Sequence, residues 1–100
     1  MDKNEVINTV KQYKVLLGEH LNFESVYLFG SCAKEVNREH SDIDVAVVVS
    51  NISDDFFAVN PLLWKLRRQI DDRIEPILID KSNDKSGFLD EIKRNGIEIA

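Results

Sequence analysis

Cysteine, proline and tryptophan are all scarce: the 100 residues contain one cysteine, two prolines and one tryptophan. A single cysteine, Cys32, excludes an internal disulfide framework and a four-cysteine zinc site. No apolar run approaches the length of about 18 residues that a membrane-spanning helix needs. The segment 1–5 has no apolar stretch behind a basic region, so no signal peptide is expected and the predicted compartment is the cytoplasm.

Positive charge is also in short supply. The chain has 13 Lys and Arg against 18 Asp and Glu, a formal net charge of −5. An acidic chain gains no long-range attraction to phosphate backbones, so general nucleic-acid binding is not expected. One nucleotide can still be bound where metal ions neutralise its phosphates.

The remaining composition is that of an ordinary globular protein, with 43% apolar and 31% charged residues. A length of 100 residues predicts one domain over 1–100. Apolar spacing and turn residues predict helices over 2–21, from Ser31, from Asn60-Pro61 to about residue 70, and from Ser86 to Asn95, with strands over 25–29, 42–49, 73–79 and near Ile97. This alternation predicts an α/β (α+β) fold with a small sheet flanked by helices.

Two aspartates begin the most apolar of these strands. Asp42 and Asp44 are two positions apart, so in a strand they share one face, roughly 6.6–6.8 Å apart along the chain. The valines that follow predict a central strand buried on both faces. Neighbouring carboxylates repel each other unless a cation lies between them, and magnesium commonly takes one or two carboxylates plus substrate phosphates. N-capping or a turn before the strand is the alternative role.

Gly30-Ser31 stands where the strand over 25–29 gives way to a helix. A glycine lets the backbone approach a ligand closely, and a helix N-terminus offers free N–H groups and partial positive charge. The pair therefore predicts a phosphate site, with a plain turn and N-cap as the alternative. A third carboxylate, Glu75, lies inside the strand over 73–79, where a charged residue needs a partner or a function. An ion pair with Arg73 or a lysine would also explain it.

Gly30-Ser31-Cys32-Ala33, a gap of ten residues after Ser31, and Asp42-Ile43-Asp44 together resemble the signature of the DNA polymerase β-like nucleotidyltransferase superfamily. The similarity is to its minimal stand-alone members and covers most of the chain. Two positions depart from their pattern: Lys34-Glu35 stands in place of Arg-Gly, and Glu75 in place of Asp.

The resemblance implies a nucleotidyltransferase fold with a mixed sheet, and transfer of a nucleoside monophosphate to a hydroxyl. It implies ATP or another nucleoside triphosphate as donor, and two magnesium ions, with manganese as an alternative. The partner it implies is a small helical toxin of the HEPN type, neutralised by this chain as antitoxin. The residues expected to act are Asp42, Asp44 and Glu75 as catalytic metal ligands, and Gly30, Ser31 and Ser41 in nucleotide binding.

Three other functions remain open at this point. A degenerate member would neutralise its partner by binding alone, and another class would modify a small molecule of the aminoglycoside type. The third is an α/β domain with a surface metal site. Oligomerisation is also left open. On the helix after Pro61, Lys65, Arg67 and Arg68 are expected on a solvated face, and Trp64 in the core.

Overall fold

The computed structural model describes residues 3–30, 42–50, 56–83 and 87–100. Its helices are α1 (Lys3–Gly18), α2 (Phe56–Arg67) and α3 (Phe88–Asn95), with a 3₁₀ turn, η3 (Lys81–Asn83). Its strands are β1 (Ser25–Phe29), β2 (Ile43–Val49), β3 (Ile74–Asp80) and β4 (Ile97–Glu98). The predicted helix at Ser31, and the residues Ser41 and Ser86, lie outside the described residues.

The four strands form one mixed sheet in the order β3-β2-β1-β4. β1 pairs antiparallel with both β2 and β4, whereas β2 and β3 run parallel. The valine run of β2 therefore lies inside the sheet, as predicted. Pro76 lies in β3, which is an edge strand of the sheet. Proline has no backbone N–H to donate to a neighbouring strand, so an edge strand tolerates it. The mixed α/β fold predicted from the sequence is confirmed.

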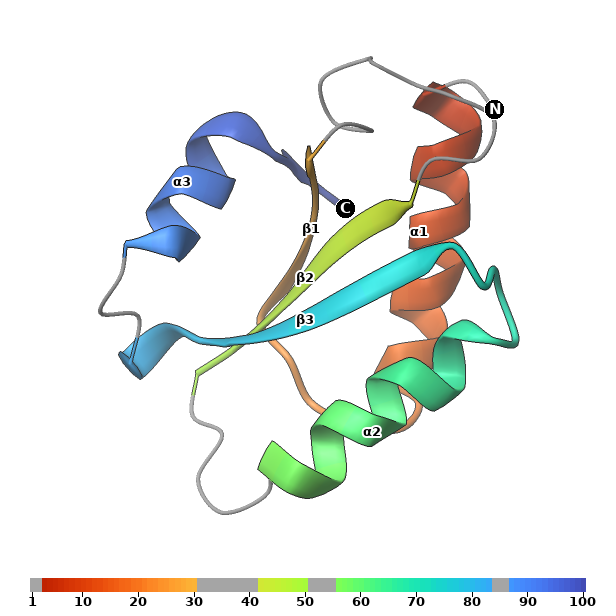
Figure 1. Ribbon diagram of the computed structural model, residues 1–100, viewed down its shortest axis with the longest axis horizontal. Helices are drawn as coiled ribbons and strands as arrows, with labels where there is room; N and C mark the ends of the chain where they lie inside the picture. The colour runs from red at the N-terminus through yellow and green to blue at the C-terminus, as the bar shows by residue number, and fades with distance from the viewer. Residues whose placement is uncertain (1–2, 31–41, 51–55, 84–86) are drawn as a thin grey trace.

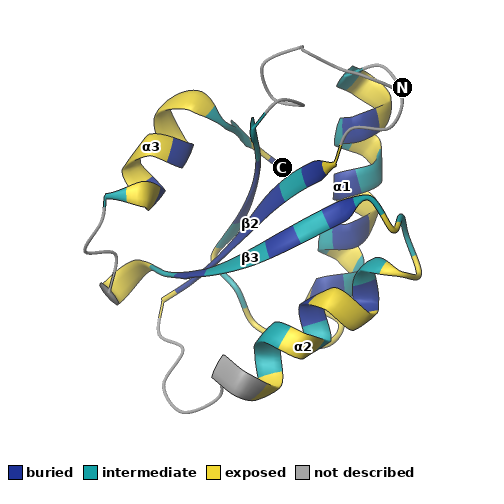
Figure 2. Ribbon diagram, in the orientation of Figure 1, coloured by how far each residue is buried: buried dark blue, intermediate teal, exposed yellow. Residues whose placement is uncertain are grey.

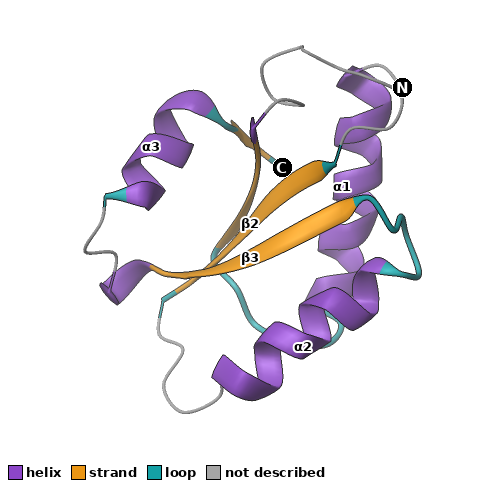
Figure 3. Ribbon diagram, in the orientation of Figure 1, coloured by secondary structure: helices purple, strands orange, loops and turns teal. Residues whose placement is uncertain are grey.

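Helices cover both faces of the sheet (Figures 1 and 3). α1 and α2 pack against one face and form the larger core with Val45, Val47 and Ile74. α3 covers the other face through Leu89 and Ile92, which meet side chains of all three longer strands. Figure 2 shows the buried strands between exposed outer helix surfaces. Asp44 and Glu75 belong by strand alternation to the α3 face.

α2 differs from the prediction. It begins at Phe56, so Pro61 lies inside the helix rather than at its first position. Proline in the sixth position cannot donate to the carbonyl four residues back, which costs the helix one hydrogen bond. The apolar stripe explains why the helix nevertheless starts earlier: Val59 packs against the same core as Leu63 and Leu66.

α1 ends at Gly18, three residues before the predicted end. Directly after it the backbone N–H groups of Glu19 and His20 donate to carbonyl oxygens three residues back, which tightens the turn.

Tyr13 links the two helices on this face, α1 and α2. Its buried hydroxyl donates a 2.7 Å hydrogen bond to the carbonyl oxygen of Leu63 in α2. Burial raises the pKa of the Tyr13 hydroxyl far above its ordinary value, so the group stays a donor at every physiological pH.

The Tyr13 hydrogen bond gives the first test of this packing. Tyr13→Phe removes the donor while keeping the ring, and we expect the free energy of unfolding to fall by about 1 kcal/mol. Urea unfolding measures the change. Val15→Ala is the control, because Val15 lies in the same helix but is 69% exposed and should change stability by about 0.5 kcal/mol or less. Equal losses in the two variants would contradict the role given to the hydroxyl.

Candidate active site

Three residues form a row across the α3 face of the sheet. In the strand register, Phe29 of β1 pairs with Asp44 of β2, and Asp44 pairs with Glu75 of β3. Paired residues point to the same face, with neighbouring strands about 4.8 Å apart. Asp42 lies two residues before Asp44 and just outside β2, on the same side by alternation. The register thus brings together the three carboxylates that the sequence singled out.

Gly30 closes this row at the end of β1. Its φ of +76° is a backbone conformation that side chains disfavour. A Cβ atom placed on it would collide with Asp44 Oδ2 and lie 3.2 Å from Asp44 Cγ. The positive φ therefore favours glycine at this position, and an added side chain would also have to turn the end of the Asp44 side chain aside.

The pKa values of Asp44 and Glu75 are both raised above their ordinary values. Burial raises the pKa of Asp44 above its ordinary value, and the charge of Asp42 raises it further. The pKa of Glu75 is raised by burial, then by the charges of Asp42 and Asp44 and by a side-chain hydrogen bond with Asp42, while Arg67 acts in the opposite direction. Such mutual repulsion is what a bound cation would relieve.

The donor chemistry fits a hard divalent cation, with one restriction. Across the described residues, no group of three or more His, Cys, Asp or Glu side chains is placed to hold one metal ion. A cage made wholly of protein ligands is therefore not formed there. Magnesium does not need one, because it usually keeps water and combines one or two carboxylates with substrate phosphates. The pairs Asp42–Asp44 and Asp44–Glu75 meet that smaller demand.

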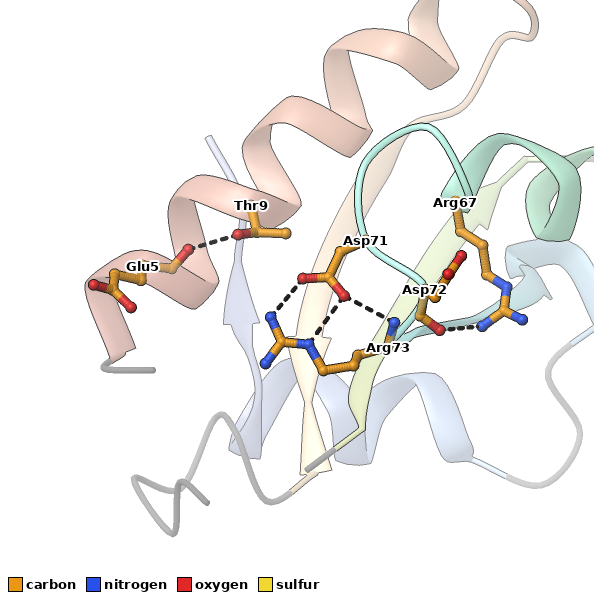
Figure 4. Close-up of polar contacts among 6 residues, drawn as sticks. All are labelled: Glu5, Thr9, Arg67, Asp71, Asp72 and Arg73. Carbon is orange, nitrogen blue, oxygen red and sulfur yellow. Dashed lines mark hydrogen bonds and ion pairs between the residues drawn. The ribbon is translucent and has the colours of Figure 1, made fainter. Parts of the chain in front are cut away.

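The nearby basic residues are engaged in holding β3 in place (Figure 4). Arg73 forms an ion pair with Asp71, with Nη2 and Oδ2 2.6 Å apart, instead of the ion pair with Glu75 considered from the sequence. Arg67 Nη1 donates to the carbonyl oxygens of Asp72 at 2.5 Å and Ile74 at 3.0 Å. Both arginines thus fix the entry into β3 directly before Glu75.

Arg67 also corrects two sequence predictions. It does not lie on a solvated face with Lys65 and Arg68, since its Nε atom is buried and has no hydrogen-bond partner. Trp64 is 37% exposed and is not a core residue. The guanidinium carbon of Arg67 lies 4.6 Å from the centre of the Trp64 ring, so the indole covers the charged group. Lys65 and Arg68 are exposed as predicted.

A pocket beside Gly30 was not predicted. It lies between the end of β1 and α3, and its lining residues are Phe29, Gly30, Phe88, Glu91, Ile92 and Asn95. The spacing of the four α3 residues in the sequence does indicate that they share one side of a helix. Which strand end they would face depends on the packing of α3, and that is a tertiary property.

The outcome for the six predicted site residues is therefore divided. The structure brings Asp42, Asp44 and Glu75 together and places Gly30 against Asp44. Ser31 and Ser41 lie outside the described residues.

No helix in the described part of the chain is long and apolar enough to cross a membrane.

This fold agrees with the family to which the chain belongs. Residues 5–100 match the model of the polymerase beta nucleotidyltransferase family, and the chain is a member of that family. One relative is "Putative protein adenylyltransferase MJ0141" of Methanocaldococcus jannaschii. It is 28% identical over 99 residues, which span 95% of this chain and 99% of the relative.

Two solved structures share the fold. One is a "putative nucleotidyltransferase from Sulfolobus solfataricus", with a TM-score of 0.69 and 23% identity over 96% of this chain and 80% of that one. The other is a toxin-antitoxin structure with AMP-PNP, with a TM-score of 0.66 and 26% identity over 93% of this chain and 73% of that one. The nucleotidyltransferase fold expected from the motif is thereby confirmed.

The contact between Gly30 and Asp44 can be tested with a matched glycine. Gly87 has nearly the same φ, +73°, but a Cβ atom there would meet nothing within 4 Å. We expect Gly87→Ala to cost about 1 kcal/mol of unfolding free energy, from backbone strain alone. Gly30→Ala should cost about 1 kcal/mol more, because the added methyl group turns the end of the Asp44 side chain out of its preferred rotamer. Urea unfolding of both variants measures the difference.

A double variant isolates the collision. In an Asp44→Ala background, Gly30→Ala should cost no more than Gly87→Ala does, because the displaced carboxylate is absent. An undiminished cost in that background would show that Asp44 is not what crowds Gly30.

The raised pKa of Asp44 predicts a pH dependence of stability without metal. Because folding makes Asp44 bind its proton more tightly, the folded state loses stability as pH rises through and above the ordinary value of 3.8. Asp44→Asn should therefore raise the free energy of unfolding at pH 7, by about 0.5 kcal/mol after solvent screening. The gain should vanish near pH 3, and urea titrations with EDTA measure it.

Asp71→Asn is the control with the opposite sign. The hydrogen bond with Arg73 holds the pKa of Asp71 below its ordinary value, so its contribution is favourable above pH 3.8 and is lost as pH falls. This substitution should lower stability at pH 7, by about 1 kcal/mol. Destabilisation of the same size by Asp44→Asn at pH 7 would refute the repulsion described above.

Proposed function

We propose that this protein is a magnesium-dependent adenylyltransferase that moves AMP from ATP to a hydroxyl group of a partner protein, as the antitoxin of a toxin–antitoxin pair. The observation that carries the proposal is the row of carboxylates, with Asp44 paired to Glu75 and Gly30 packed against Asp44. Nucleotidyl transfer needs metal-binding carboxylates beside a phosphate-binding backbone, and this arrangement offers both.

The tasks are divided among the site residues as follows. Asp42 and Asp44 hold magnesium, with manganese as an alternative ion, and Glu75 completes a second ion's ligands. The metal, when bound, neutralises charge on the phosphates and on the attacking and leaving oxygens. Gly30 presents its backbone to the triphosphate, and Ser31 and Ser41 are assigned to the same task from the sequence motif alone.

The reaction balances without an external reagent. The acceptor hydroxyl oxygen attacks the α-phosphorus and forms a new O–P bond. The bond from that phosphorus to the oxygen bridging to the β-phosphate breaks, and pyrophosphate leaves. Glu75 is assigned to take the hydroxyl proton.

A protein acceptor is supported by the relatives. The archaeal relative is named for protein adenylylation, and the toxin-antitoxin neighbour holds AMP-PNP. The partner we propose is a small helical toxin of the HEPN type, as the sequence motif implies. The competing functions are transfer to a small molecule and neutralisation of the partner by binding alone. The experiments that follow give a different result for each.

Label transfer tests the reaction. Wild-type protein with magnesium and α-phosphate-labelled ATP should label a protein in a lysate of the source organism, whereas γ-labelled ATP should give no label. Asp44→Asn should reduce labelling about a hundredfold or more, since the carboxylate that holds the metal is lost. Removal of magnesium with EDTA should have the same effect. Asp72→Asn is the control, because Asp72 is exposed and lies outside the carboxylate row.

Four results would contradict parts of the proposal. Label from the γ position would indicate a kinase. Label on a small molecule would replace the protein acceptor. Label retained by Asp44→Asn would refute the site. Full toxin neutralisation by an Asp42→Asn/Asp44→Asn double variant would show that binding alone suffices.

A further inference from the structure

The pocket beside Gly30 is built by one face of α3. Phe88, Glu91, Ile92 and Asn95 are spaced at i, i+3, i+4 and i+7, so all four project from the same side of the helix. They face the end of β1, where Phe29 and Gly30 complete the lining. Ile92 is buried at 2% exposure, while Phe88 is 37% exposed, so the pocket has an apolar floor and an accessible wall.

The lining of the pocket suits part of an aromatic ring. Its volume is about 120 Å³, and it opens to solvent. It is smaller than the cavity of about 150 Å³ that encloses benzene in another protein, so it would contact a ring on one side and not enclose it. Phe29 and Phe88 meet edge to face, with ring centres 5.9 Å apart and planes at 89°. Two aromatic rings held at right angles give an entering ring a face to stack on and an edge to contact.

The pocket adjoins the carboxylate row. Gly30 lines the pocket and also lies against the Asp44 carboxylate. Phe29 lines the pocket and is the register partner of Asp44, so its ring projects to the same face as that carboxylate. The pocket is therefore within reach of the base of a nucleotide whose phosphates lie near Gly30 and Asp44.

Polar groups at the rim indicate which ring would be bound. The Glu91 carboxylate is an acceptor only, whereas the Asn95 carboxamide both donates and accepts. The two residues are exposed and lie one helical turn apart. Glu91 can accept a hydrogen bond, and Asn95 beside it can donate or accept one. This pair matches the edge of a base that carries an exocyclic amino group next to a ring nitrogen, as adenine does.

We propose that this pocket binds the base of the donor nucleotide, and that Glu91 selects a base with an exocyclic amino group. The inference rests on the proposed function, because it assigns the base of the nucleotide whose phosphates lie at Gly30 and Asp44. One of the two rings, Phe88 or Phe29, stacks on the base and the other contacts it by its edge. Glu91 accepts from the amino group of the base, and Asn95 pairs with the adjoining ring nitrogen.

Calorimetric binding of three magnesium-loaded probes tests the inference: ATP, inosine triphosphate and inorganic tripolyphosphate. Inosine triphosphate keeps the ring but has a carbonyl where ATP has the amino group, and tripolyphosphate lacks both sugar and base. Wild-type protein should bind ATP about tenfold more tightly than inosine triphosphate, and should bind tripolyphosphate most weakly.

The variants should separate the two contacts. Glu91→Ala should weaken ATP binding about tenfold and leave inosine triphosphate and tripolyphosphate unchanged. Phe88→Ala should weaken both nucleotides and leave tripolyphosphate unchanged. Asp90→Ala is the matched control, because Asp90 and Glu91 are neighbouring acids in the first turn of α3, yet only Glu91 lines the pocket. Circular dichroism confirms that each variant is folded.

The possible failures are distinguishable. Equal affinities for ATP and tripolyphosphate would overturn the base pocket and leave the proposed transfer standing. Equal losses of ATP affinity in Glu91→Ala and Asp90→Ala would show that Glu91 acts only through its negative charge on α3. That result would overturn the role of Glu91 in selecting the base. No binding of any of the three probes would contradict the proposed function together with this inference.

Discussion

The parallel pairing of β2 with β3 places Asp44 directly opposite Glu75, and this pairing determines the chemistry of the site. Like charges facing each other across two strands are unfavourable. The same strands offset that cost on their other face, where the neighbouring residues Val45, Val47 and Ile74 are almost fully buried against α1 and α2. Burial on one face of the sheet thus maintains a repulsive cluster on the opposite face.

The two faces of the sheet are therefore unequal. The face under α1 and α2 holds the larger set of buried side chains, together with the hydrogen bond from Tyr13 to Leu63. The α3 face holds a smaller apolar cluster, and the carboxylates and Gly30 lie beside it. A chain of 100 residues has little surface to share between a ligand site and a large core. Here the core occupies one face of the sheet and the candidate site occupies part of the other.

Period-two alternation in the sequence was enough to predict that Asp42 and Asp44 share a face, since residue phase within a strand is a local property. The valine run predicted the central position of β2, and Pro76 fits the edge position of β3. Strand register is not local, so the sequence could single out Glu75 as a third carboxylate but not its pairing with Asp44. The pocket under α3 was not predicted either.

The errors share a physical cause. Arg73 was considered as the partner of Glu75 because the two residues share a strand face, but the turn before β3 brings Asp71 to the guanidinium first. Trp64 was expected in the core, and Arg67 in solvent, from hydrophobicity alone. In the structure the long arginine side chain turns back over the β3 entry and the indole covers it, which reverses both expectations.

The geometry also constrains how an acceptor would reach the site. In the placement proposed for the donor base, beside Phe29 and Phe88, Glu75 lies on the other side of Asp44 in the strand order. β3 is the edge of the sheet, and Pro76 follows Glu75 directly. Proline removes a backbone donor at that edge, which disfavours docking by addition of a strand. A partner protein is therefore expected to approach Glu75 without pairing its backbone to β3.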